Sequence, residues 1–92
     1  MVVYLVSYDI TDDHARNRVA RILMEHGQRV QKSVFEISLR QAAELEQLCQ
    51  RIAKELDEET NVRFYRLCQP CQQHSRQLDG SKVAYFPAVV VI

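Results

Sequence analysis

The amino-acid sequence predicts a single α/β domain, residues 1–92, in which helices cover one face of a small sheet. Residues 2–9 form an apolar stretch without glycine or proline, which is typical of a buried strand. Two later stretches carry apolar residues at helical spacing, and strand-like segments follow each of them. Hydrophobic residues make up 47% of the chain and charged residues 26%, so the composition is that of a globular protein.

A first helix is predicted directly after the opening strand. Thr11 or Asp12 can cap its N-terminus, and the acidic residues nearby suit the positive end of the helix dipole. Gly27 is placed to end the helix. The apolar stripe that would face the sheet is formed by Ala15, Val19, Ile22 and Leu23.

The middle of the chain predicts a second strand and a second helix. Residues 28–38 are expected to form one strand, with a bulge near Lys32 and Ser33, because the apolar alternation changes phase there. Residues 40–58 show the clearest helical pattern in the chain. Its apolar positions are Leu45, Leu48, Cys49, Ile52, Ala53 and Leu56.

The remaining segments complete the prediction. Residues 62–67 are expected to form a strand, 68–81 a long polar loop and 82–86 a further strand. Together the elements indicate an α+β sandwich of the ferredoxin-like β-α-β-β-α-β type, with an antiparallel sheet and two helices on one face. The apolar tail at 88–92 would be an exposed edge unless it paired with another strand. Its addition to a partner subunit's sheet, in a twofold dimer, is therefore expected.

Charge along the chain is uneven although the total is zero. The net charge is −3 over residues 1–13, +4 over 14–43, −4 over 44–60 and +3 over 61–92. A neutral total argues weakly against nucleic-acid binding, but alternating blocks allow one basic face. The alternative is a mixed, solvated surface.

Since no signal peptide or membrane-spanning segment is visible, we expect a cytoplasmic protein with no membrane partner and with reduced thiols.

Four motifs in order give a specific resemblance. They are "VSYDI", a basic amphipathic helix, "GQRVQKSVFEI" and "VRFYRLC". This order resembles the small CRISPR-associated spacer-acquisition proteins, a ferredoxin-like family described as endoribonucleases or endonucleases. The resemblance implies a homodimer with an exchanged C-terminal strand, at the centre of a complex with the CRISPR-associated integrase. It also implies binding of double-stranded DNA (the protospacer) or single-stranded RNA, and in some members Mg²⁺-dependent cleavage.

Asp9 matches the acid at the end of the family's first strand. A bound Mg²⁺, or Mn²⁺ in its place, could supply the charge stabilisation and activated water that phosphodiester hydrolysis needs. One carboxylate per chain binds such an ion weakly, so the prediction is a catalytic and metal-binding pair of Asp9 residues across a twofold axis. The alternative is that Asp9 makes a turn or caps the first helix. Asp12 and Asp13 are predicted as capping or first-turn acids.

Other positions resemble the family pattern without a clear chemical role. Tyr8 could touch a substrate or pack at the sheet end, and Ser33 is expected to shape the bulge. Phosphate contacts that position nucleic acid without reading its sequence are predicted for a set of basic residues. The set is Arg16, Arg18, Arg21, Arg29, Lys32, Arg63 and Arg66.

The segment "CQPCQQH" offers Cys68, Cys71 and His74 as three zinc ligands, with Cys49 or a residue of a partner as a fourth. Because Cys49 lies on the apolar stripe of the second helix, reduced and unligated thiols are the preferred interpretation.

Three functions remain open at this point. The first is a CRISPR adaptation nuclease with paired Asp9 residues. The second is a non-catalytic DNA-binding scaffold that bridges integrase subunits, and the third is a toxin-type ribonuclease on a similar fold.

Overall fold

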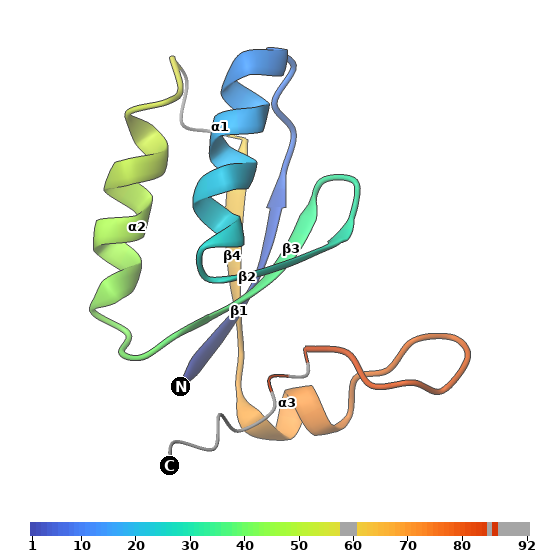
Figure 1. The fold of residues 1–92 in the computed structure, drawn as a ribbon. Helices are drawn as coiled ribbons and strands as arrows, with labels where there is room; N and C mark the ends of the chain where they lie inside the picture. Colours follow the sequence, from blue (N-terminus) through green and yellow to red (C-terminus); the bar gives the residue numbers. More distant parts are fainter. Residues whose placement is uncertain (58–60, 85, 87–92) are drawn as a thin grey trace.

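The computed structural model describes residues 1–57, 61–84 and 86. Four strands form one sheet in the order β2-β3-β1-β4, and every neighbouring pair is antiparallel. The ferredoxin-like order of strands and helices predicted from the sequence is confirmed (Figure 1). The elements are β1 (Val2–Tyr8), α1 (Asp13–Met24), β2 (Gly27–Gln31), β3 (Val34–Leu39), α2 (Glu44–Ala53), β4 (Val62–Leu67) and α3 (Gln69–Gln73).

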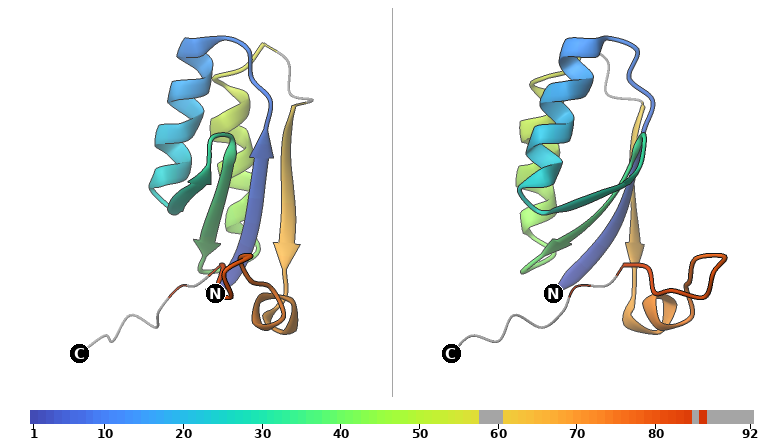
Figure 2. Two further views of the ribbon diagram at one scale, coloured as in Figure 1. Left: turned by 90° about the vertical axis from the view of Figure 1, so that its right-hand side faces the viewer. Right: turned by 45° about the vertical axis from the view of Figure 1, so that its right-hand side comes forward.

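The core lies between the sheet and helices α1 and α2, which both cover the same sheet face (Figure 2, left). Alternate residues of β1 and β3 point to this face because side chains alternate along a strand. The predicted stripe of α1 is buried, and so are two of the apolar positions predicted for α2. The fully enclosed side chains are Val6, Val19, Leu23, Phe35, Ile37 and Leu39. No helix in the described parts of the chain is long and apolar enough to cross a membrane.

The strand predicted over 28–38 is in fact a hairpin of two strands. β2 and β3 pair antiparallel, and Lys32 and Ser33 form the turn between them. A register irregularity is present close to the predicted bulge, but it lies between Arg29 and Gln31, before the turn, and not at Lys32 and Ser33. A turn of two residues reverses the chain and also shifts the phase of apolar alternation, so it produces the same sequence pattern as a bulge.

Gly27 does not end helix α1 as predicted. The helix ends at Met24, and Glu25 follows in the right-handed helical region with its N–H bonded to the last turn. Gly27 is the first residue of β2, and a Cβ atom there would lie 2.0 Å from the carbonyl oxygen of Glu36. The position therefore requires glycine because the backbone of β3 approaches closely, rather than for a left-handed turn.

Helix α2 is shorter than the predicted 40–58. The chain after β4 also differs from the prediction, because the short helix α3 forms where a loop was expected. No strand forms over 82–86 in the described residues, where Lys82 makes an isolated bridge to Arg76. The predicted tail strand at 88–92 lies outside the described residues.

The sheet face away from the helices is partly covered by the chain that follows α3. Glu36, on β3, is only 6% exposed on this face, and its carboxylate accepts the N–H of Ala84 at 2.8 Å. Ala84 has a φ of 50°, in the left-handed region that alanine seldom adopts. A hollow of about 430 Å³ between Leu5, Val34 and the returning chain lies beside this bond.

Replacing Gly27 with alanine should destabilise the β2–β3 hairpin. The new methyl group would meet the backbone of Glu36 and Ile37, which cannot turn aside as a flexible side chain could. We expect Gly27→Ala to lower the free energy of unfolding by about 1–3 kcal/mol, as measured by urea denaturation. Gln28→Ala, on the exposed neighbouring residue, is the matched control and should stay within about 0.5 kcal/mol. Equal stabilities of the two variants would contradict the close approach.

Candidate functional site

The backbone of Asp9 is fixed by the strands on both sides of β1. At the end of β1 the N–H of Tyr8 donates to the carbonyl of Ser33 at 3.1 Å, and the N–H of Asp9 donates to the carbonyl of Asn61 at 2.9 Å. The Asp9 side chain is exposed. Within the described residues its carboxylate takes part in no hydrogen bond or ion pair. This geometry leaves the Asp9 oxygen atoms available to a ligand from solvent.

Asp12 is the residue that caps helix α1. Its carboxylate accepts the N–H of Ala15 at 3.2 Å, and its carbonyl accepts the N–H of Arg16 at 2.9 Å. Asp13 follows as the acid of the first turn. The predictions of Asp12 as a cap and Asp13 as a first-turn acid are confirmed. Since Asp12 occupies the N-cap position of α1, Asp9 does not cap this helix.

Arg16 ties the segment after Asp9 to the first turn of α1. Its guanidinium donates to the carbonyl of Ile10 at 3.0 Å and forms an ion pair with Asp13. The side chain is 32% exposed, so part of it still faces solvent. Arg16 therefore positions residues 10–13, and the predicted phosphate contact would use the part that is still exposed.

Tyr8 and Ser33 have structural positions beside this segment. Tyr8 is 4% exposed and packs its ring against Phe35, with centroids 6.1 Å apart. Its buried hydroxyl has no hydrogen-bond partner among the described residues. The contact of Ser33 with β1 is made by its carbonyl group, at the hairpin turn rather than at a bulge. Packing at the sheet end is the interpretation of Tyr8 that these contacts support.

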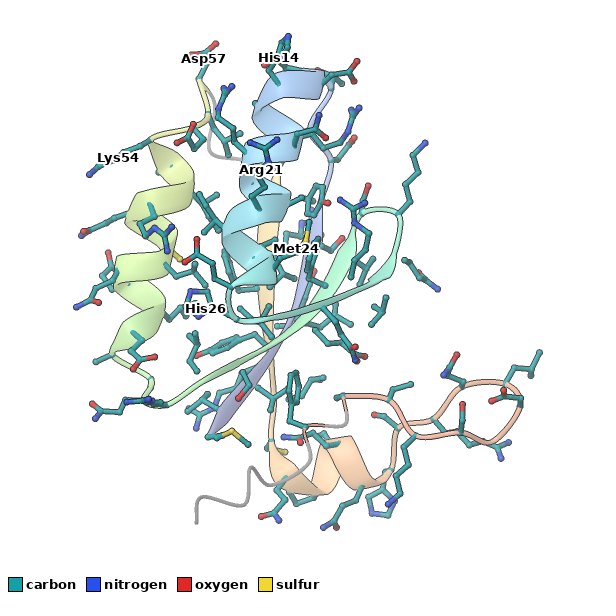
Figure 3. All side chains as sticks on the ribbon, in the orientation of Figure 1. His14, Arg21, Met24, His26, Lys54 and Asp57 are labelled. Carbon is teal, nitrogen blue, oxygen red and sulfur yellow. The ribbon has the colours of Figure 1, made fainter. Side chains whose placement is uncertain are left out.

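The basic residues of the first half of the chain lie around α1 and the hairpin. Arg18 and Arg21 are three residues apart on α1 and share a face of the helix. Arg18 forms an ion pair with Glu55 at 2.5 Å, whereas Arg21 is exposed on the side of α1 away from the sheet (Figure 3). Arg29 lies over the ring of Phe35 at 5.4 Å, and Lys32 is exposed at the hairpin turn.

The two arginines of β4 lie on opposite faces of the sheet. Arg63 is opposite Ser7 and its guanidinium donates to the Tyr65 hydroxyl at 3.3 Å, on the open face. Arg66 is opposite Tyr4, whose side chain lies in the core layer. One protomer therefore does not gather the seven predicted phosphate contacts on one surface. Any continuous basic track must use a subset of them.

The three predicted zinc ligands do not form a metal site in the described part of the chain. The Sγ atoms of Cys68 and Cys71 are 3.0 Å apart, but no three metal-binding side chains gather there or elsewhere in the described residues. His74 is the exposed residue that ends α3. Cys49 lies on α2 in an apolar pocket with Ile52 and Phe64, and burial raises the pKa of its thiol. Cys49 is thus a packing residue, as predicted.

Two residues near the open face and the strand end were missed by sequence reasoning. Asn61 precedes β4 and holds Asp9 only through its carbonyl group, which no side-chain pattern reveals. Glu36 alternates with the core residues Phe35 and Ile37 along β3, so its assignment to the face away from the core was available from strand parity. Its burial there depends on the chain that returns over the sheet, which sequence periodicity does not predict.

Comparison with known proteins identifies the family. The family model described as CRISPR associated protein Cas2 matches residues 1–75. The chain belongs to the Cas2 family. A Chloroflexus aurantiacus protein named CRISPR-associated endoribonuclease Cas2 1 is 43% identical over 72 residues, which cover 76% of each chain.

Solved Cas2 structures share the fold described above. A chain from a structure described as a partial Cas6-RT-Cas1–Cas2 complex has a TM-score of 0.83 at 34% identity, covering 94% of this chain and all of that one. The crystal structure of Streptococcus pyogenes Cas2 at pH 6.5 has a TM-score of 0.71 at 34% identity, covering 83% of this chain and 98% of that one. The resemblance to this family that the four sequence motifs indicated is confirmed.

Asp9 and Asp12 should differ in their effect on folding. Asp9→Ala removes no hydrogen bond within the described structure, so we expect the free energy of unfolding to change by less than about 0.5 kcal/mol. Asp12→Ala removes the helix cap and should cost about 1 kcal/mol. Urea denaturation at pH 7 measures both. If Asp9→Ala were the more destabilising variant, Asp9 would be a structural turn residue.

Proposed function

We propose that this chain acts in CRISPR adaptation, the acquisition of new spacers, as a homodimer that binds duplex DNA and bridges subunits of the CRISPR-associated integrase. Membership of the Cas2 family supports the adaptation role. Likeness to the chain of a Cas1–Cas2 complex is the observation that carries the proposal of an integrase partner. The apolar sequence at 88–92 suits strand exchange between subunits.

We further propose that Asp9 is the centre of a Mg²⁺-dependent endonuclease acting on RNA or DNA phosphodiester bonds. The exposed carboxylate on a fixed strand end supports this, since Mg²⁺ prefers carboxylate oxygen and keeps several of its waters. Mn²⁺ accepts the same ligands. No three metal-binding side chains gather within the described residues, and the proposal takes the second carboxylate from Asp9 of the other subunit across the twofold axis. The names of the relatives as endoribonucleases agree with a nuclease activity at the level of the family.

The protein's own residues hold this site in place. When bound, Mg²⁺ supplies charge stabilisation to the phosphate and activates a water molecule. Asp9 provides the negative charge and oxygen atoms that bind the ion. The strands on both sides of β1 fix the Asp9 backbone, and Arg16 fixes the segment that follows through Ile10. These contacts fix the backbone from which the Asp9 side chain projects into solvent.

The scaffold function is the second candidate. It keeps the dimer and the DNA-binding surface but leaves cleavage and joining to the integrase. The exposed basic groups Arg21 and Lys32 serve this function without any catalytic group. A toxin-type ribonuclease is disfavoured, because the family match covers most of the chain and places it among CRISPR proteins.

Replacing Asp9 with asparagine tests the nuclease proposal. Labelled single-stranded RNA and double-stranded DNA are incubated with the purified dimer while Mg²⁺ or Mn²⁺ is titrated, with EDTA as the blank. We expect metal-dependent cleavage that falls at least about 100-fold in Asp9→Asn, since even outer-shell changes at metal sites cost 10- to 100-fold. Asp12→Asn is the matched control, because it removes the same charge yet asparagine still caps a helix.

Metal binding gives a second measurement that does not depend on activity. Paramagnetic resonance of Mn²⁺ should show an ion bound by the wild-type dimer and none by the Asp9→Asn dimer. Equal cleavage by both proteins, or none by either together with equal Mn²⁺ binding, would remove the nuclease proposal and leave the scaffold function.

The salt dependence of DNA binding tests the basic surface. Removing one side chain that binds a phosphate should reduce the slope of log K against log salt by about 0.9. We expect this reduction for each subunit whose side chain contacts the duplex, in Arg21→Ala and in Lys32→Ala, measured by fluorescence anisotropy with a labelled duplex. Arg51→Ala is the control of equal charge, because Arg51 is held in a two-bond ion pair with Glu25 at 2.9 Å. The same slope change in all three variants would indicate a net-charge effect and contradict a defined track.

A further inference from the structure

The chain after β4 brings two cysteine thiols together. Cys68 follows the strand directly, and α3 begins at the next residue. Pro70 lies in the first turn of α3, where its missing N–H breaks no helical hydrogen bond. Residues three apart on a helical turn share one face, and the Sγ atoms of Cys68 and Cys71 are 3.0 Å apart. Both side chains are exposed.

Hydrogen bonds hold the turn around both cysteines. The carbonyl of Cys68 accepts the N–H of Gln72 at 3.0 Å, and the carbonyl of Cys71 accepts the Ser75 hydroxyl at 2.6 Å. The Gln72 side chain also donates to the carbonyl of Leu67 at 2.8 Å, which ties α3 to the end of β4. Since a disulfide bond is about 2.05 Å long, the two sulfur atoms need to approach by only about 1 Å to bond.

The two thiols differ in their surroundings. Their mutual hydrogen bond is the main cause that lowers the pKa of Cys68, and the positive charge of Arg66 acts in the same direction. The hydrogen bond and charge of Cys68 raise the pKa of Cys71. Such an asymmetry gives one thiol that attacks as a thiolate and one that follows it.

We propose that Cys68 and Cys71 are a redox-active dithiol, which closes to an intrachain disulfide by exchange with a small-molecule disulfide such as oxidised glutathione. The pair is a modification site separate from the Asp9 site. Leu67 is opposite Val3 at the beginning of β1, so the pair lies at the other end of the sheet from Asp9, about 20 Å away along the strand. The proposal does not depend on whether Asp9 is catalytic.

The exchange proceeds in two balanced steps. The Cys68 thiolate attacks one sulfur of oxidised glutathione, the glutathione S–S bond breaks, and one glutathione thiolate leaves and takes up the proton lost by Cys68. The Cys71 thiolate then attacks Cys68 Sγ in the mixed disulfide, and the second glutathione leaves as thiolate and is protonated. The two cysteines are oxidised by two electrons, and one oxidised glutathione is reduced to two thiols.

Cys49 serves as an internal reference for both steps. Its thiol lies in the apolar pocket beside α2, and its pKa is raised rather than lowered. A reaction driven only by exposure to oxidant would therefore be slowest at Cys49 and equal at the two exposed cysteines. A dithiol reaction would couple Cys68 to Cys71.

The test is a redox titration of the full-length protein. The reduced chain is equilibrated in glutathione buffers of increasing oxidised fraction at pH 7, trapped with acid and N-ethylmaleimide, and analysed by peptide mass spectrometry. We expect two of the three alkylatable thiols to disappear together, with the new bond mapped to Cys68 and Cys71. Cys49→Ser should behave in the same way. Cys71→Ser should retain a glutathione bound to Cys68, while Cys68→Ser, which lacks the attacking thiol, should retain less. Hydrogen exchange at the Gln72 and His74 amides should slow on oxidation.

Three results would overturn the proposal. The first is a wild-type chain that keeps all three thiols, or a stable glutathione adduct, in buffers that fully oxidise thioredoxin. The second is a disulfide that joins two chains instead of closing within one. The third is zinc that remains bound to the reduced protein after dialysis, because it would make the pair a metal site.

Discussion

The central position of β1 is the constraint on which the rest of the structure depends. Its backbone is paired on both edges, with β3 on one side and β4 on the other, so its direction and register are fixed by two independent ladders. One side of the strand supplies Tyr4, Val6 and Tyr8 to the core below the helices. A strand held in this way cannot slip by one residue without moving its whole apolar side to the opposite face. The candidate acid is placed by the same constraint, because Asp9 is the first residue beyond the last paired position.

Much of this arrangement could be predicted from the sequence, at the positions where a single signal such as apolar spacing determines the local structure. The buried strand and the stripe of α1 were predicted because apolar spacing reports directly which residues face a core. The hairpin was missed because a two-residue turn and a bulge shift the alternation alike. Gly27 was misassigned because glycine serves both left-handed turns and close backbone contacts, and only the neighbouring strand shows which applies. The strand predicted at 82–86 had a suitable composition, but Lys82, Val83 and Ala84 lie over the open face beside Glu36 instead.

In the candidate site, too, features set by neighbouring residues could be predicted, whereas features set by the packing of distant segments could not. The position of Asp9 at a strand end and the cap at Asp12 follow from neighbouring residues, so both were accessible to sequence reasoning. The roles of the basic residues were not, since charge counts along a chain carry no information about faces. The two arginines of β4 illustrate this, because three residues of strand place them on opposite sides of the sheet. The charge of Arg18 is already paired with Glu55, so this arginine has less charge to offer a phosphate than an arginine with no acidic partner.

The bond between Glu36 and Ala84 has a consequence for the order of folding. It joins residues 48 positions apart, so a long loop must close before the buried carboxylate gains its partner. The β1–β4 ladder also joins distant residues, from Tyr8 with Val62 to Val3 with Leu67, but the four strands and helices α1 and α2 use no residue beyond Leu67. The sheet can thus assemble first, and the cover over its open face is added last. By the same reasoning, local release of this cover would expose Glu36 and the open face while the rest of the protomer stays folded.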